Sequence, residues 1–463
     1  MKILRTLRKL AAEVIATSPR KAAVSVALML ALSFTEGVGL LLLMPLLGLV
    51  GISETTTMPN VDGWFAVGFK AVGMTPTLGS VLAFFVSIAA LRALLTRLQS
   101  WVNVALREEF TSRMRVRVYR AIVGAEWKFL VTRRLPEFVH VLAGEIGRVG
   151  SAAFQIIDLA VLVAVSVVYL GLAFHLSSVM AALVLSCAGV LAWAVRRTLD
   201  EAKTSGGRAS TARGKLHVAI AEHMSSMKTA KSYGAVDRNV AIFKRLSGEL
   251  RDMSLEVTAG ETKLQQNLEL GSTVLLALLV YVSFEILEVP AAQLLVLLFI
   301  FARLMPRLVT IYRRVQSLAS VLPVFDLVAD LERACLEAAE PAGADAWDIA
   351  PAGVIRLERV SFTYLQRPKA PAVRDVDLEI GVGLTTAIVG PSGAGKSTLA
   401  DLLIGLLSPT IGRILVDGEP LSAERIAGWR RHISYVPQET FLFHDTVRAN
   451  LAWARPEATD KEL

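Results

Sequence analysis

Apolar residues gather into six long stretches in the first two thirds of the chain, separated by polar segments of unequal length. Most of the stretches approach the ~20 residues that a helix needs to cross the hydrocarbon core of a bilayer. They cover residues 22–50, 78–96, 152–174, 179–195, 270–287 and 291–304. The pattern predicts six membrane-spanning helices.

The segment before the first stretch, residues 1–21, has a different pattern. Its basic residues alternate with apolar ones at helical spacing, which predicts an amphipathic helix lying on the cytoplasmic membrane surface. A solvated leader without membrane contact is the alternative. The basic residues are Lys2, Arg5, Arg8 and Lys9.

Positive charge orients the predicted spans. Lys and Arg are frequent at the N-terminus, in the two long polar stretches at 97–148 and 196–268, and after Arg303, whereas the other three loops carry almost none. The positive-inside rule therefore places the basic segments in the cytoplasm. Both long stretches lack strand alternation and keep apolar residues at helical spacing, so we expect the spanning helices to continue into the cytoplasm.

Composition agrees with a membrane protein that carries a soluble part. The 463 residues are 54% hydrophobic and only 19% charged, against about 25% charged residues in soluble proteins. The net charge of +8 fits cytoplasmic loops, and we expect no nucleic-acid partner. Two cysteines, Cys187 and Cys335, are too few for a disulfide framework, and we expect both to be reduced.

A change of pattern after the last stretch marks a second domain. Residues 331–353 are rich in Ala and acidic residues and predict a linker. Its first turns, up to about Glu340, could instead extend the last helix. Alternating patterns then predict strands. These lie at 355–362, 373–380, 384–389, 414–416 and 433–438. The predicted domains are the N-terminal helix 1–21, a membrane domain 22–330, the linker 331–353 and an α/β domain 354–463.

One motif in this domain carries chemistry. Residues 390–397 fit the pattern G-x-x-x-x-G-K-[ST] between a predicted strand and a predicted helix. Glycines let backbone N–H groups approach phosphate oxygens, and the helix N-terminus adds positive partial charge. Lys396 would reach the β- and γ-phosphates and Ser397 would ligate Mg²⁺. A glycine-rich structural turn is the alternative. The candidate binding residues are Gly390, Ser392, Gly393, Gly395, Lys396, Ser397 and Thr398.

Six spans, two long inner loops and a following P-loop domain resemble a half-transporter of the ABC exporter family. The resemblance covers almost the whole chain and implies a type IV exporter-like membrane domain followed by part of a nucleotide-binding domain. It also implies that Tyr364 stacks on adenine and that Gln438, a catalytic residue, contacts Mg²⁺ together with Ser397. A packed strand aromatic and a solvated strand end are the alternatives. Regions near Trp127 and at 222–234 resemble coupling helices.

The chain departs from the family beyond Gln438. Gln438 resembles the glutamine of the family's Q-loop. Three further family motifs follow the Q-loop: the LSGGQ signature, the Walker B aspartate with the catalytic glutamate, and the switch histidine. This sequence does not contain them. We therefore expect either a fragment of a longer protein or a truncated product. Whether this chain alone hydrolyses ATP stays open.

The resemblance implies ATP-driven export of a hydrophobic or amphipathic substrate, such as a lipid, lipid-linked sugar, peptide or drug. It implies ATP and Mg²⁺ as cofactors, contact with membrane lipids, and a homodimer or heterodimer in the cell inner membrane. The alternative is a truncated, non-hydrolysing membrane protein with at most weak nucleotide binding. Glu36, near the middle of the first span, is either a substrate-passage residue or a helix-packing group.

Overall fold

The computed structural model describes residues 2–41, 78–176, 178–286, 291–341, 350–364, 366, 369–438 and 441–463. The chain divides into two compact units. The first comprises Met1–Val123 and Arg134–Ala334, and the second comprises Gly124–Arg133 and Cys335–Leu463.

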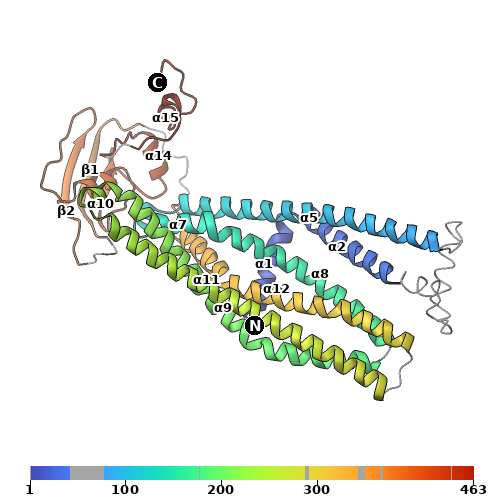
Figure 1. Cartoon of the computed structure of the whole chain (residues 1–463). Coiled ribbons are helices and arrows are strands. Elements are labelled where there is room, and N and C mark those ends of the chain that lie inside the picture. Colours follow the sequence, from blue (N-terminus) through green and yellow to red (C-terminus); the bar gives the residue numbers. More distant parts are fainter. Residues whose placement is uncertain are drawn as a thin grey trace. The chain divides into compact units, whose positions relative to one another are not determined.

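The first unit is built from helices, several of which are far longer than a membrane requires (Figure 1). Helices α5, α9, α11 and α12 have 46, 48, 46 and 47 residues, or about 70 Å each, against a hydrocarbon core of about 30 Å. The prediction that the spans continue as helices is confirmed. The helices are α1 (Lys2–Thr17), α2 (Pro19–Leu41), α5 (Leu78–Val123), α7 (Leu135–His140), α8 (Ile146–Leu176), α9 (Ser178–Ser225), α10 (Met227–Ser232), α11 (Val236–Tyr281) and α12 (Ala291–Glu337).

Every predicted spanning stretch is helical wherever the structure describes it. By length and composition, three helices in the described part of the chain could cross a membrane, or four if a bent pair counts as one span. The three are Gly79–Val123, Leu135–Gly171 and Val236–Glu285, and the pair is Leu10–Thr17 with Pro19–Thr35. The stretches at 179–195 and 291–304 consist mostly of residues whose side chains lie outside the described set, as does the side chain of Glu36.

Helix α1 forms over residues 2–17, within the range that the amphipathic pattern predicts. A bend of 106° separates it from the helix that starts at Pro19. Leu10 and Val14 are only 3% and 1% exposed, and α1 contacts α8, α2 and α5. The apolar face of α1 therefore packs at least in part on the protein itself.

A buried carboxylate joins the start of α8 to the C-terminal half of α9. Glu145, fully buried, ends a π-helical turn, η1 (Val141–Glu145), that precedes α8. Its partners are Arg148 Nη1 at 2.9 Å, Arg213 Nη1 at 3.3 Å, His140 Nε2 at 3.3 Å and the Ser210 hydroxyl at 3.1 Å. Because so many donors converge on one carboxylate, Glu145 fixes the packing of these segments.

Replacing Glu145 with Ala should destabilise the membrane unit. The substitution leaves two arginines near a site without their counter-charge, and breaking a buried pair costs roughly 3–5 kcal/mol. We expect the lower end, because Arg148 and Arg213 keep 28% and 30% of their side chains exposed. Thermal unfolding in detergent measures the effect. Glu249→Ala, which breaks an exposed pair with Arg245, is the control and should change the Tm little.

Close helix contact in the same unit depends on Gly206 in α9. A Cβ atom there would overlap the backbone of Ser320 in α12. Gly206→Ala should therefore lower the Tm, because the obstructing atoms are backbone and cannot rotate away. Gly248→Ala on α11 has open space and should raise stability slightly, since Ala is favoured over Gly in helices. Equal effects of the two substitutions would contradict this packing.

The second unit contains a four-stranded antiparallel sheet in the order β2-β1-β3-β4. The strands are β1 (Val354–Phe362), β2 (Val373–Gly381), β3 (Ile411–Val416) and β4 (Glu419–Pro420), and the helices are α6 (Trp127–Leu130), α13 (Lys396–Leu403), α14 (Ile426–Arg431) and α15 (Val447–Leu451). The strands predicted at 355–362, 373–380 and 414–416 are confirmed. Leu357 and Phe362 of β1 pack with Leu399 and Leu402 of α13 in one core.

Two other predicted strands are wrong for this structure. Residues 384–389 and 433–438 are not in strands, and Val389 and Val436 are 89% and 84% exposed. A buried parallel strand needs neighbours on both edges and cover on both faces. In the described residues the sheet is wholly antiparallel, so it offers these two segments no parallel partner.

Candidate phosphate-binding site

The loop at 390–397 has the backbone that its glycines permit. Gly393 and Gly395 lie at φ +82° and +89°, in the left-handed region that favours glycine. Gly395 has a second constraint, because a Cβ atom there would overlap the Ala372 carbonyl oxygen. Only glycine at position 395 therefore lets the loop pass this close to Ala372, the residue that precedes β2.

Helix α13 begins directly after the loop, at Lys396, with Gly395 as its N-cap. Leu399 and Leu402 are 8% and 0% exposed in the domain core, so packing fixes the direction of the helix. The first N–H groups of a helix lack intrahelical partners, and its dipole favours an anion at that end. The arrangement can bind phosphate at the start of α13.

Lys396 folds back over the loop. Its Nζ donates hydrogen bonds to the carbonyl oxygens of Gly390 and Pro391, both at 2.9 Å. The ammonium is thereby held at the loop rather than directed into solvent. Phosphate oxygens could replace these carbonyls as acceptors, with stronger charge-assisted bonds.

Ser397 and Thr398 differ in exposure. Ser397 is exposed, whereas Thr398 is only 8% exposed. The Thr398 Oγ1 lies 3.3 Å from the Tyr364 hydroxyl oxygen. Ser392 and Gly393 are exposed on the loop itself.

The structure brings Tyr364 to the phosphate loop through this contact. The Tyr364 ring also packs edge-on against Phe362, with centroids 4.9 Å apart and planes at 89°. Tyr364 therefore packs in the domain core through its ring and contacts the start of α13 through its hydroxyl group.

Gln438 is placed differently. It is exposed, and among the described residues no hydrogen bond joins it to any residue of 390–398. The structure therefore assembles the P-loop residues and Tyr364 but does not add Gln438 to them.

A Mg²⁺ ion fits this donor set only together with a nucleotide. Mg²⁺ prefers oxygen ligands and is commonly held by one or two protein groups plus substrate phosphates. The exposed Ser397 hydroxyl can supply one such oxygen. In the part of the chain that the structure describes, no group of three or more His, Cys, Asp or Glu side chains could hold a metal.

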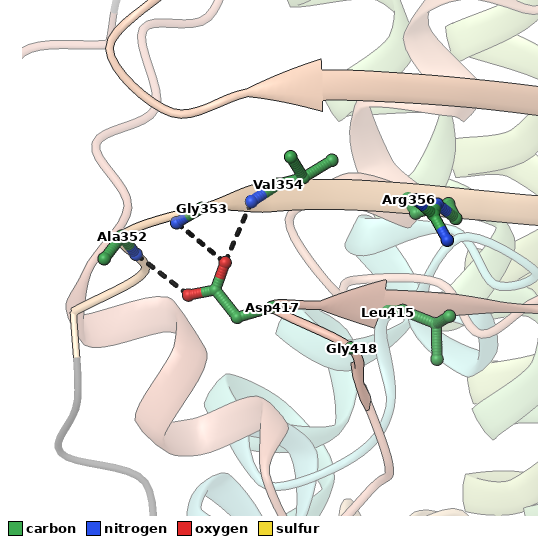
Figure 2. A pocket seen from close by; sticks show the side chains of 7 residues that line it. All are labelled: Ala352, Gly353, Val354, Arg356, Leu415, Asp417 and Gly418. Carbon is green, nitrogen blue, oxygen red and sulfur yellow. Dashed lines mark hydrogen bonds between the residues drawn. The ribbon is translucent and has the colours of Figure 1, made fainter.

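A separate pocket lies where the linker enters the sheet (Figure 2). Its lining residues are Ala352, Gly353, Val354, Arg356, Leu415, Asp417 and Gly418. Asp417 and Gly418 have φ of +51° and +83° and form the two-residue turn between β3 and β4, as a type I′ hairpin requires.

The Asp417 carboxylate is already engaged by backbone. It accepts hydrogen bonds from the N–H groups of Ala352, Gly353 and Val354 at 2.8–2.9 Å. These bonds, that of Ala352 foremost, lower the pKa of Asp417 below its usual value of 3.8. Asp417 therefore anchors the start of β1 instead of offering a ligand, a role that the sequence analysis did not find.

Acid should release this anchor. Because the folded-state pKa is depressed, the stabilisation is present above pH 3.8 and is lost as the pH falls through the lower folded-state pKa. Hydrogen exchange of the Ala352, Gly353 and Val354 amides, corrected for intrinsic rates, should show this loss. Asp417→Asn should weaken protection at neutral pH and remove the acid transition. The control Glu424→Gln should leave both unchanged.

Comparison with known proteins bears on both units. The family model "ABC transporter transmembrane region" matches residues 44–305, more than half of the chain, and the model "ABC transporter" matches residues 373–463. The P-loop lies inside the second match.

Individual relatives agree with these matches. The chain is 25% identical over 408 residues to the "ATP-dependent lipid A-core flippase" of Chromobacterium violaceum, covering 88% of this chain and 68% of that protein. It is 44% identical over 111 residues to the "ABC multidrug transporter mdr2" of Aspergillus fumigatus, covering 24% of this chain and 14% of that protein. The second alignment spans only a small part of the relative.

A solved structure shares the fold. It is described as "Structure of a bacterial Atm1-family ABC exporter with ATP bound" and matches with a TM-score of 0.73 at 18% sequence identity. The match covers 96% of this chain and 75% of that one. At this identity the likeness concerns the fold alone.

Proposed function

This chain belongs to the ABC transporter family, and we propose that it is one half of an exporter that uses ATP to move a hydrophobic or amphipathic substrate out of the cytoplasm. The observation that carries the proposal is the P-loop geometry: left-handed glycines, a core-anchored α13 and Lys396 held over the loop. The membrane-spanning helices of the first unit supply the path.

Within the proposal each loop residue has a role. The N–H groups around Ser392, Gly393 and Gly395 surround the phosphates, and Lys396 neutralises their charge. Ser397 and Gln438 hold Mg²⁺, which supplies charge neutralisation for phosphoryl transfer. Tyr364 presents its ring to the adenine, and buried Thr398 holds the Tyr364 hydroxyl in position.

We further propose that the chain works as a homodimer or heterodimer. Apolar side chains remain exposed at the α9–α10–α11 hairpin, both within 222–234, the region that resembles a coupling helix, and just beyond it. Met224, Tyr233, Val240 and Phe243 are 60%, 82%, 57% and 41% exposed. A second half-transporter would cover them.

The substrate class rests on the membrane helices and on relatives. Leu94, Val168 and Val274 expose 55%, 71% and 68% of their surface, which suits contact with lipid. Relatives are named for lipid A-core, fatty acid and multidrug transport. We therefore propose that the substrate is amphipathic and that the protein lies in the cell inner membrane. We also propose four segments: an N-terminal helix 1–21, a membrane domain 22–330, a linker 331–353 and a nucleotide-binding domain 354–463.

A second candidate follows from the segments 384–389 and 433–438, which lie outside the strands. They flank the phosphate loop and the Q-loop glutamine without sheet support, which favours loose nucleotide binding. The alternative function is a membrane protein that binds nucleotide weakly and does not hydrolyse it.

Lys396→Ala should abolish ATP-dependent activity. The protein is translated from its full reading frame and assayed in membrane vesicles. We expect the rate of ATP hydrolysis by the variant to be roughly 100-fold or more below that of the unmodified protein, because one preorganised charge-stabilising donor contributes about that much. Lys461→Ala, an exposed lysine of the same unit, should leave the rate unchanged. Hydrolysis that survives Lys396→Ala would refute the P-loop assignment, and binding without hydrolysis in the unmodified protein would support the second candidate.

A further inference from the structure

Two chain segments that lead out of long membrane-unit helices are paired inside the second unit. The Glu126 N–H donates to the Ala338 carbonyl oxygen at 2.8 Å, and the Glu340 N–H donates to the Gly124 carbonyl oxygen at 2.9 Å. Ala125 and Ala339 form an antiparallel bridge. We call residues 124–126 and 338–340 the joint. Since α5 ends at Val123 and α12 at Glu337, both helices run directly into it.

A forked ion pair holds the joint to α14. Arg430 Nη1 lies 2.9 Å from Glu340 Oε2, and Arg430 Nη2 lies 3.1 Å from Glu340 Oε1. The two side chains are 28% and 37% exposed, whereas Arg413, which pairs with Glu358 on the sheet, is 66% exposed. A bidentate arginine pair fixes orientation as well as distance.

The same arginine also donates a hydrogen bond to the chain just after α13, the helix that follows the P-loop. Arg430 Nη2 donates to the Gly405 carbonyl oxygen at 2.7 Å. The preceding residue, Trp429, is 5% exposed, and its Nε1 donates to the Leu403 carbonyl oxygen at 2.8 Å. Leu403 is the last residue of α13, whose first residue is Lys396. Helix ends leave carbonyl groups unsatisfied, so α14 satisfies them while also holding Glu340.

We propose that the Arg430–Glu340 pair is a positioning contact that carries movement of α13 to the joined ends of α5 and α12. The inference rests on the proposed binding of nucleotide at the P-loop. Helix α13 has eight residues and is therefore only about 12 Å long, so a tilt at Lys396 displaces Leu403 and Gly405. Arg430 passes that displacement to Glu340, and the backbone pairing of the joint distributes it to both helices.

Loss of the Arg430–Glu340 pair should have effects that differ from the loss of an ordinary surface ion pair. An exposed pair contributes little to stability, and its loss should change little else. Loss of a positioning pair should leave nucleotide binding in place, because none of its atoms belongs to the P-loop, yet reduce the response of the membrane helices at saturating nucleotide. The two effects can be measured separately.

The test places a fluorophore on α5. Val116→Cys, at a position 52% exposed, is labelled with an environment-sensitive probe in a Cys187→Ser background, and the protein without Val116→Cys reports labelling of Cys335. The ligand is Mg²⁺ with a non-hydrolysable ATP analogue, and its affinity is measured separately with a radiolabelled form. The variants are Glu340→Gln, Arg430→Gln and both together, with Arg413→Gln as the matched control.

We expect the analogue to change the probe signal in the unmodified protein and in Arg413→Gln. Each single variant should still bind the analogue, with an affinity that shifts by no more than the coupling factor, but lose about fivefold or more of the signal amplitude at saturation. The double variant should lose no more than either single one, because the two residues act as a unit. Arg430→Lys, which keeps the charge but not the fork, should give an intermediate amplitude and serves if Arg430→Gln does not fold.

Full signal in the single variants, or additive losses in the double variant, would overturn the inference. Analogue binding without any signal in the unmodified protein would also overturn it, while leaving the proposed nucleotide site intact. Absence of analogue binding in the unmodified protein would instead contradict the proposed function.

Discussion

The left-handed backbone at Gly395, pressed against the Ala372 carbonyl, is the constraint on which the nucleotide-side geometry depends. It starts α13 at Lys396, and the burial of Leu399 and Leu402 then sets the direction of that helix. Direction at the start decides where the helix ends, and α14 holds that end through Trp429 and Arg430. A single glycine thus links phosphate chemistry to a packing arrangement eight residues away.

The membrane unit is under a different constraint, because it must stay rigid over helices more than twice as long as the hydrocarbon core of a bilayer is thick. Apolar contact alone cannot order the helix portions beyond the apolar stretches, because much of their surface is polar. A buried carboxylate, Glu145, supplies a directional fixed point between η1, α8 and α9. Gly206 lets α9 approach the backbone of α12. A transporter that couples nucleotide binding to its membrane helices needs such rigid helices, because a flexible helix would bend and would not transmit a displacement from one end to the other.

The sequence predicted what depends on local pattern. Apolar length predicted the helices, and alternation predicted β1 and β2. It failed at 384–389, because an apolar run signals a buried parallel strand only if neighbouring strands are there to pair with it. The roles of Glu145 and Arg430 were not found either. Their partners stand 65 to 90 positions away, at Ser210 and Glu340, and no local signal reports such distances.

Part of the candidate site also lies beyond local reasoning. The motif placed the glycines, Lys396 and Ser397 together, and the structure adds Tyr364 through Thr398. Gln438 is exposed, and among the described residues no hydrogen bond joins it to residues 390–398, so the structure does not add it to the site that the motif predicts.

We propose that ATP binds with its phosphates on the P-loop and its adenine against Tyr364. Photolabelling with 8-azido-ATP, followed by mass spectrometry of the modified peptide, tests this placement. We expect label on the peptide that contains Tyr364, with loss of label when unmodified ATP competes. Label on a peptide remote from Tyr364, or label that ATP does not displace, would contradict it.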